Sequence, residues 1–150
     1  MDSSRPAPER LRTLASRLLA FAATQGDRLV GDRLAAVGAR KWHYAVLASL
    51  QEYGPASQAE LSRRAGIYRS DMVAVLNELA DGGYVERTPD HADKRRNVIT
   101  ITDDGRRRLD RLQGLIAAGE GELLVPLSAA ERDELVRLLT LVVDHHGERM

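Results

Sequence analysis

The sequence contains no cysteine among its 150 residues. This absence excludes disulfide frameworks, thiolate nucleophiles, thiol redox switches and cysteine-based zinc sites. The chain also has no apolar run that approaches the roughly 18 residues needed to span a bilayer, and its first residues lack the pattern of a secretory signal. We therefore expect a cytoplasmic protein.

Neither sign of charge is in excess, because 22 Lys and Arg residues balance 22 Asp and Glu residues. A broadly basic coat for nucleic acid is excluded, and any anion-binding surface must be built locally from positioned side chains. The sequence also lacks a glycine-rich phosphate loop, a His-x-x-x-His pair and a Gly-x-Ser-x-Gly turn. It therefore predicts no enzyme and no cofactor.

Apolar spacing and capping signals predict a mainly helical chain that forms one domain. Capping boxes at Ser57–Glu60 and Ser128–Glu131 mark two helix starts. The expected helices cover residues 9–23, 41–53, 57–65, 70–81, 102–122 and a last segment that begins after Ser128. A glycine-punctuated region, residues 26–38, separates the first two and receives no assignment.

The middle of the chain combines a helix-turn-helix candidate with a hairpin. The helices at 57–65 and 70–81 are short and are joined by a glycine-containing turn. Residues 84–88 and 97–101 are β-prone, and the eight residues 89–96 between them are polar. The predicted fold is therefore mainly α with a small β-hairpin wing, a winged helix-turn-helix between flanking helices.

The expected helix at 70–81 has two contrasting faces. One face carries the apolar side chains Met72, Val75, Leu76 and Leu79, and the other carries Ser70, Val73, Ala74 and Asn77. The second face has no bulky side chain, which suits a helix that enters a DNA major groove about 12 Å wide. The alternative is an ordinary solvated helix face.

Four residues on or beside this face are candidates for DNA contacts. Arg69, at the helix entrance, can bind guanine or phosphate, and Asn77 can bind adenine or phosphate. Val73 can contact a thymine methyl group, and Ser70 can receive a phosphate at the helix N-terminus.

Three segments resemble the MarR family of bacterial transcriptional regulators. The segment Asp93-Lys-Arg-Arg-Asn-Val-Ile-Thr-Ile-Thr-Asp-Asp-Gly105 matches the wing pattern of that family: Asp-x-Arg, three residues, an aliphatic, one residue, an aliphatic, Thr, two residues and Gly. Gly54-Pro-Ala-Ser-Gln-Ala-Glu-Leu-Ser-Arg-Arg-Ala-Gly66 and Gly83-Tyr-Val-Glu-Arg87 also fit. The resemblance covers nearly the whole chain.

The resemblance implies a homodimer that binds a pseudo-palindromic site on double-stranded DNA. Dimerisation helices would occupy about 1–40 and 106–150, and the DNA-binding lobe about 41–105. The implied role is a repressor relieved by a small, aromatic ligand.

The resemblance also implies roles for the wing residues. Arg95 would enter the minor groove, Asp93 would orient it, and Lys94 and Arg96 would lie beside phosphates. The alternative is a solvated, charged hairpin that prevents edge-to-edge strand pairing.

Two residues depart from the family pattern. Tyr68 stands where similar sequences place a small N-capping residue, so either the helix starts later, at Ser70, or the tyrosine hydroxyl contacts DNA. Asp71 complements the helix dipole but repels phosphates, so we expect a helix-start residue, with ligand sensing as the alternative.

The remaining candidate sites have simpler alternatives. Trp42, His43 and Tyr44 would line an effector pocket by resemblance, or else form a core corner. The three arginines at 106–108 look basic, but Asp103 and Asp104 at i−4 of the last two predict intrahelical ion pairs. No metal is expected at His145–His146, because adjacent side chains diverge on a helix.

Two other functions stay open at this point. A winged helix can serve as a protein-interaction module that never touches DNA, and a DNA-binding dimer can be architectural and insensitive to ligands.

Overall fold

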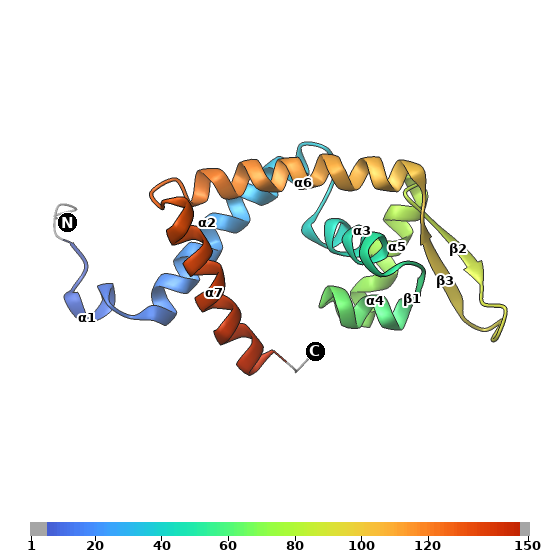
Figure 1. Cartoon of the computed structure of the whole chain (residues 1–150), viewed down its shortest axis with the longest axis horizontal. Helices are drawn as coiled ribbons and strands as arrows, with labels where there is room; N and C mark the ends of the chain where they lie inside the picture. Colours follow the sequence, from blue (N-terminus) through green and yellow to red (C-terminus); the bar gives the residue numbers. More distant parts are fainter. Residues whose placement is uncertain (1–5, 148–150) are drawn as a thin grey trace.

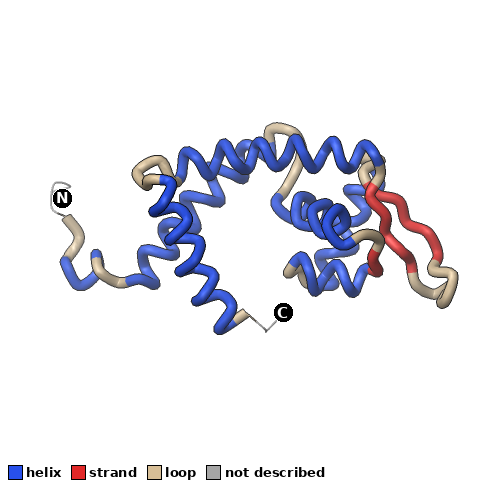
Figure 2. Tube along the Cα trace, viewed as in Figure 1, coloured by secondary structure: helices blue, strands red, loops and turns tan. Residues whose placement is uncertain are grey.

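The computed structural model describes residues 6–147. Residues 1–5 and 148–150, which belong to the expected dimerisation segments, lie outside the described part. The elements, in chain order, are α1 (Glu9–Arg12), α2 (Ala15–Ala35), α3 (Lys41–Tyr53), β1 (Ala56–Ser57), α4 (Gln58–Ala65), α5 (Arg69–Asp81), β2 (Val85–Pro89), β3 (Asn97–Ile101), α6 (Asp103–Leu123) and α7 (Ala129–His146). Helices dominate, and the strands are confined to one end of the molecule (Figure 2).

Helix α6 runs between the two ends of the molecule (Figure 1). Helices α2 and α7 lie near its C-terminal end, whereas α3, α4, α5 and the sheet lie near its N-terminal end. Helix α2 packs along α6. A Cβ atom at Gly119 of α6 would come within 3.0 Å of the Leu29 carbonyl oxygen and the Val30 Cα atom, so glycine permits this close approach.

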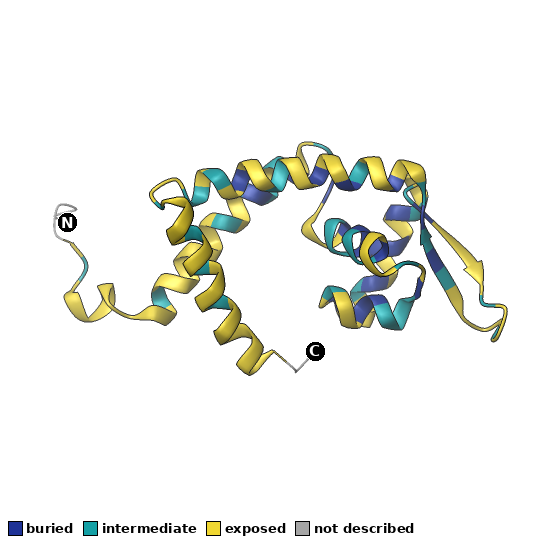
Figure 3. Cartoon of the chain, in the orientation of Figure 1, coloured by how far each residue is buried: buried dark blue, intermediate teal, exposed yellow. Residues whose placement is uncertain are grey.

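One continuous core joins the end of α2 to α3, α4, α5, the sheet and the first half of α6 (Figure 3). Its fully buried side chains include Leu34, Leu47, Leu50, Leu61, Met72, Leu76, Ile99 and Leu112. Helix α7, in contrast, contains no buried residue. The chain therefore folds around its helix-turn-helix region and leaves its last helix uncovered.

The sheet has three antiparallel strands in the order β1-β3-β2. Strands β2 and β3 pair from Val85 opposite Ile101 to Pro89 opposite Asn97, which leaves residues 90–96 as the hairpin tip. Strand β1 pairs with β3 through Ala56 and Ser57. Strand β1 could not be predicted, because two residues are too few to show the alternation of a strand.

The base of the hairpin is fixed to the start of α6. The Thr102 hydroxyl donates to the Gly83 carbonyl oxygen (2.7 Å), and the Thr102 hydroxyl oxygen accepts from the Gly105 backbone N–H (3.0 Å). The Thr102 backbone N–H also donates to the Tyr84 carbonyl oxygen (3.1 Å). A Cβ atom at Gly105 would lie 2.1 Å from that carbonyl oxygen, so only glycine fits.

The predicted winged helix-turn-helix fold is confirmed, and the main differences lie near the N-terminus. The first expected helix, 9–23, is interrupted at Thr13 and Leu14, where the Thr13 hydroxyl donates to the Glu9 carbonyl oxygen (3.0 Å) and Leu14 is extended. Helix α2 then continues to Ala35, through glycines that lower helix propensity. Packing against α6 outweighs that cost.

Two arginines at the start of α6 pair with the aspartate three residues before them, not four as predicted. Arg106 binds Asp103 (2.8 Å) and Arg107 binds Asp104, both at i,i+3 spacing. Arg108 instead donates to the Val37 carbonyl oxygen (2.6 Å). The expected i−4 pairs are therefore wrong, because the third arginine turns toward the chain that follows α2.

Candidate nucleic-acid interface

Helix α5 buries one face completely and exposes the other. On the core side, Met72, Val75 and Leu76 are 0% exposed. The four residues of the opposite face, Ser70, Val73, Ala74 and Asn77, are all exposed. Val73 is 47% exposed although it is apolar. The exposed face is thus low in profile and available to a partner.

The start of α5 places two large polar side chains in solvent. The helix begins at Arg69, one residue before the predicted start, and Tyr68 occupies the N-cap position without forming a side-chain cap. Tyr68 is 67% exposed, and Arg69 is exposed beside it. Asp71 is half-buried in the first turn, where its negative charge complements the helix dipole.

Asn77 is joined to the wing by a residue that we had not assigned from the sequence. Arg87 of β2 donates from Nη1 to Asn77 Oδ1 (2.8 Å), and both side chains are exposed. In the sequence, Arg87 stands out only as the last residue of a segment that resembles the family. Its position two residues after the buried Val85, on the same side of the strand, was the available signal.

The hairpin tip is organised by Asp93. Its Oδ1 accepts from the Arg95 backbone N–H (3.1 Å) and from Arg95 Nε (3.2 Å). Both bonds to Arg95, first the backbone bond and then the side-chain bond, lower the pKa of Asp93 because they stabilise its charged form. The Arg95 side chain is 91% exposed, and Lys94 and Arg96 are exposed on either side of it. The tip therefore presents three cations to solvent with one of them oriented.

A second polar cluster links the start of α3 to α5. Arg40 donates from Nη2 to both carboxylate oxygens of Glu78 (2.7 and 2.9 Å). The buried His43 places Nε2 2.5 Å from Glu78 Oε2, and its Nδ1 accepts from the Arg40 backbone N–H (3.0 Å). The neutral imidazole must then carry its proton on Nε2, which donates to the carboxylate. The cluster attaches α5 to the chain segment that precedes α3.

Burial and charge shift both pKa values in this cluster. Desolvation lowers the pKa of His43, with Arg40 and Arg108 acting in the same direction, against the opposing effect of Glu78. Desolvation raises the pKa of Glu78, but the hydrogen bonds from Arg40 and His43 outweigh it and lower the pKa overall. The pair is therefore most stable as a neutral imidazole beside a carboxylate.

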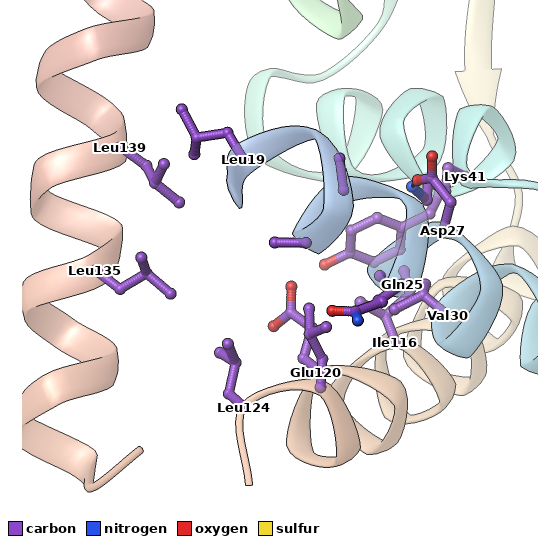
Figure 4. A pocket seen from close by; sticks show the side chains of 15 residues that line it. Leu19, Gln25, Asp27, Val30, Lys41, Ile116, Glu120, Leu124, Leu135 and Leu139 are labelled. Carbon is purple, nitrogen blue, oxygen red and sulfur yellow. Dashed lines mark hydrogen bonds and ion pairs between the residues drawn. The ribbon is translucent and has the colours of Figure 1, made fainter. Parts of the chain in front are cut away.

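A cleft of about 760 Å³ lies between α2, α3, α6 and α7. Leu19 of α2 and Leu135 and Leu139 of α7 lie on opposite sides of it (Figure 4). Polar groups are few: Glu120 is one of them, and Lys41 forms an ion pair with Asp27. The cleft is thus mainly apolar, with charged groups along part of its wall.

The three residues expected to line an effector pocket are not gathered together. Tyr44 lines the apolar cleft, whereas Trp42 lines a smaller, adjoining hollow that shares Asp27 and Lys41 with the cleft. His43 faces Glu78 instead. Sequence reasoning missed the leucines of α2 and α7 as cleft residues, because their apolar spacing also fits a core face.

Two further classes of site find no support in the described residues. In residues 6–147, no three His, Asp or Glu side chains lie close enough together to hold a metal ion. None of the described helices is both long and apolar enough to cross a membrane.

The central part of the chain matches a known family. Residues 39–96, which include α3, α4, α5, β2 and the hairpin tip, match the model of the MarR family.

Solved structures extend the similarity to most of the chain. The transcriptional repressor CouR bound to a 23-mer DNA duplex is 28% identical, with a TM-score of 0.84, and the match covers 93% of this chain and 99% of that one. The PcaV transcriptional regulator from Streptomyces coelicolor in complex with its natural ligand is 27% identical, with a TM-score of 0.78 and coverage of 93% and 98%. A mutant MarR from E. coli complexed with operator DNA is 26% identical, with a TM-score of 0.74 and coverage of 85% and 92%.

Proposed function

Because the chain belongs to the MarR family, we propose that it is a homodimeric transcriptional regulator that binds a pseudo-palindromic site on double-stranded DNA. It represses transcription until a small ligand binds. Two of the similar structures, the repressor CouR and the E. coli MarR, were solved with DNA, which supports the choice of partner.

The observation that carries this proposal is the pairing of a low-profile helix face with an oriented cation. Helix α5 would lie in a major groove, with Ser70, Val73, Ala74 and Asn77 against the bases and phosphates. Arg95, held by Asp93, would enter the adjoining minor groove, where negative potential is enhanced at narrow A·T steps. A chain with no net charge can then bind DNA, because cations are concentrated on the surface that would face the grooves.

Homodimerisation is the role that we propose for about 1–40 and 106–150. Large apolar side chains on α1, α2 and α7 are exposed, among them Leu11, Leu18, Phe21, Leu138 and Val142. A second copy of the chain would bury these surfaces against its own. About 41–105 would form the DNA-binding lobe, and the two α5 helices would then sit about one helical turn of DNA apart.

The ligand would occupy the apolar cleft, where Tyr44 offers a hydroxyl and Lys41 a cation. The structure of PcaV with its natural ligand supports a ligand-responsive function. A ligand can release DNA only if it binds more tightly to a dimer geometry in which the two α5 helices no longer match the grooves.

Arg95→Ala tests the DNA-binding function. Wild-type protein should bind a duplex from upstream of its own gene in a salt-dependent manner, and Arg95→Ala should weaken binding by roughly 10- to 100-fold, the size of one good groove contact. Fluorescence anisotropy at two salt concentrations measures both effects. Arg137→Ala removes an exposed arginine from α7 and serves as the matched control.

Absence of salt-dependent binding by the wild-type protein, to this duplex and to genomic DNA fragments, would favour the protein-interaction module instead. A thermal-shift screen with phenolic acids and other aromatic carboxylates tests the ligand. An unchanged melting temperature with all of them would favour a ligand-insensitive, architectural dimer.

A further inference from the structure

The bond between Arg87 and Asn77 connects two parts of the DNA-facing surface. Asn77 lies in the third turn of α5, on the same exposed face as Val73 and Ala74. Arg87 lies on β2 opposite Ile99 of β3, so its backbone is fixed by the sheet. The guanidinium therefore reaches the helix from a rigid support.

The chemistry of arginine settles which way the Asn77 amide faces. A guanidinium has five N–H donors and no acceptor, so the amide atom 2.8 Å from Arg87 Nη1 must be the oxygen. The amide nitrogen then faces away from Arg87. The usual ambiguity between the two ends of an asparagine side chain does not arise at this position.

This orientation limits what Asn77 can recognise. An asparagine that reads adenine by two hydrogen bonds must accept from the base N6 amino group with its oxygen and donate to N7 with its nitrogen. The bond from Arg87 uses one of the two lone pairs of the amide oxygen and holds that oxygen toward the guanidinium, so the amide nitrogen, a donor, is the group turned away from Arg87. The remaining N–H groups of Arg87 are donors as well. Guanine presents two acceptors, O6 and N7, in the major groove and is the base that matches a pair of donors.

We propose that Arg87 is a specificity-determining residue that acts through Asn77. It holds the amide oxygen toward the guanidinium, so that this position of α5 turns donors toward the groove, and the operator base opposite it is guanine rather than adenine. This inference rests on the proposed function, because it assumes that α5 enters a major groove.

The experiment is a selection of bound duplexes from a randomised DNA pool by the full-length protein, followed by sequencing. Asn77→Ala first identifies the base pair that Asn77 reads, as the position where selectivity is lost. Arg87→Met keeps the length of the side chain but removes its donors. It should lower the ratio of guanine to adenine at that same position by at least about 10-fold, within the range for a bidentate base contact, and leave the other positions unchanged.

Arg87→Lys provides the conservative rescue, because its ammonium group can still donate to the Asn77 oxygen. It should retain the preference for guanine. Arg87 is exposed, so neither variant removes a core contact, and circular dichroism of both should match that of the wild type.

Three results would overturn the inference. The first is an unchanged base preference in Arg87→Met with equally weaker binding to all sequences, which is the behaviour of a phosphate contact. The second is a shift toward adenine in Arg87→Lys. The third is the absence of any selected sequence with the wild-type protein, which would overturn the proposed function as well and so is distinguishable from the first two.

Discussion

Helices α5 and α7 are both amphipathic, but they satisfy their apolar faces in different ways. Four residues of α5 are buried within the chain, including Met72 and Leu76. Helix α7 is longer, with 18 residues against 13, and yet none of its residues is buried. The apolar face of α5 is covered within a single chain, whereas that of α7 is left exposed.

The contrast favours different partners for the exposed faces of α5 and α7. Because α5 buries four of its apolar residues on one face, its exposed face can be low in profile, as the proposed entry into a DNA groove requires. The exposed face of α7 is apolar, which favours another protein surface and in particular a second copy of the same chain.

The largest effect is expected from charges placed on α7. Leu138→Asp combined with Val142→Asp would bury two unpaired carboxylates in the dimer interface, at a cost of several kcal/mol. We expect a monomer by light scattering, at least about 100-fold weaker DNA binding, and little change in the circular dichroism of the lobe. Arg137→Ser, on the same helix, is the control and should remain dimeric. A dimer that survives the double substitution would place the interface elsewhere.

The next largest effect is expected from the core face of α5. Leu76 is 0% exposed, so Leu76→Ala should lower the free energy of unfolding by about 2–5 kcal/mol, from lost apolar contacts and the cavity that remains. Urea denaturation measures this change. Light scattering on the protein that remains folded should still show a dimer. A change below about 1 kcal/mol would mean that α5 is not anchored as described.

The two helix starts should respond differently to the loss of a side chain. Ser128 caps α7 by accepting from the Glu131 backbone N–H (3.2 Å), whereas Tyr68 at the start of α5 makes no such bond. Ser128→Ala should therefore lower the free energy of unfolding by about 1 kcal/mol, and Tyr68→Ala by much less. Equal effects in thermal unfolding would mean that capping does not distinguish the two helices.

A pH dependence of stability should arise from the cluster that anchors α5. The pKa of His43 is lowered in the folded protein, so below the ordinary histidine value of 6.5 the unfolded chain takes up a proton that the folded chain does not. Stability should be constant above about pH 6.5 and fall as the pH decreases toward the folded pKa. Glu78, whose pKa is also lowered, adds a further loss below its ordinary value of 4.5.

His43→Gln should remove the first of these two losses, because glutamine does not titrate. Urea denaturation of wild type and variant at several pH values between 5 and 8 makes the comparison. If both proteins lose stability in parallel between pH 6.5 and 5, the loss does not originate at His43.

Much of this fold could be predicted because its signals are local. The capping residues Ser57 and Ser128 and the two faces of α5 depend only on neighbours in the chain, and the structure places the helices there. The extent of α2 could not be predicted, because the contacts that carry the helix past Gly26 come from Leu123, nearly a hundred residues away.

In the candidate site, too, contacts between neighbours in the chain could be predicted and contacts that depend on packing could not. The bond between Asp93 and Arg95 joins residues two positions apart within the wing segment, and the family resemblance of that segment was enough to suggest it. The bond between Arg87 and Asn77 depends on how the hairpin lies against α5, and the position of His43 beside Glu78 depends on how α3 packs. No local pattern contains either piece of information. The DNA roles of these residues stay predictions.

Helix α6 is long enough for a small rotation at one of its ends to displace the wing at the other. Its 21 residues make a rod about 31 Å long, and Thr102 fixes the wing to one end while α7 follows the other. A rotation of the rod by about 10° about its C-terminal end moves the wing by roughly 5 Å, which exceeds the rise of about 3.4 Å per base pair along the DNA axis. If two copies meet near α7 and the wing lies on DNA, as proposed, a slight reorientation at the contact between the copies would displace the wing by more than one base pair.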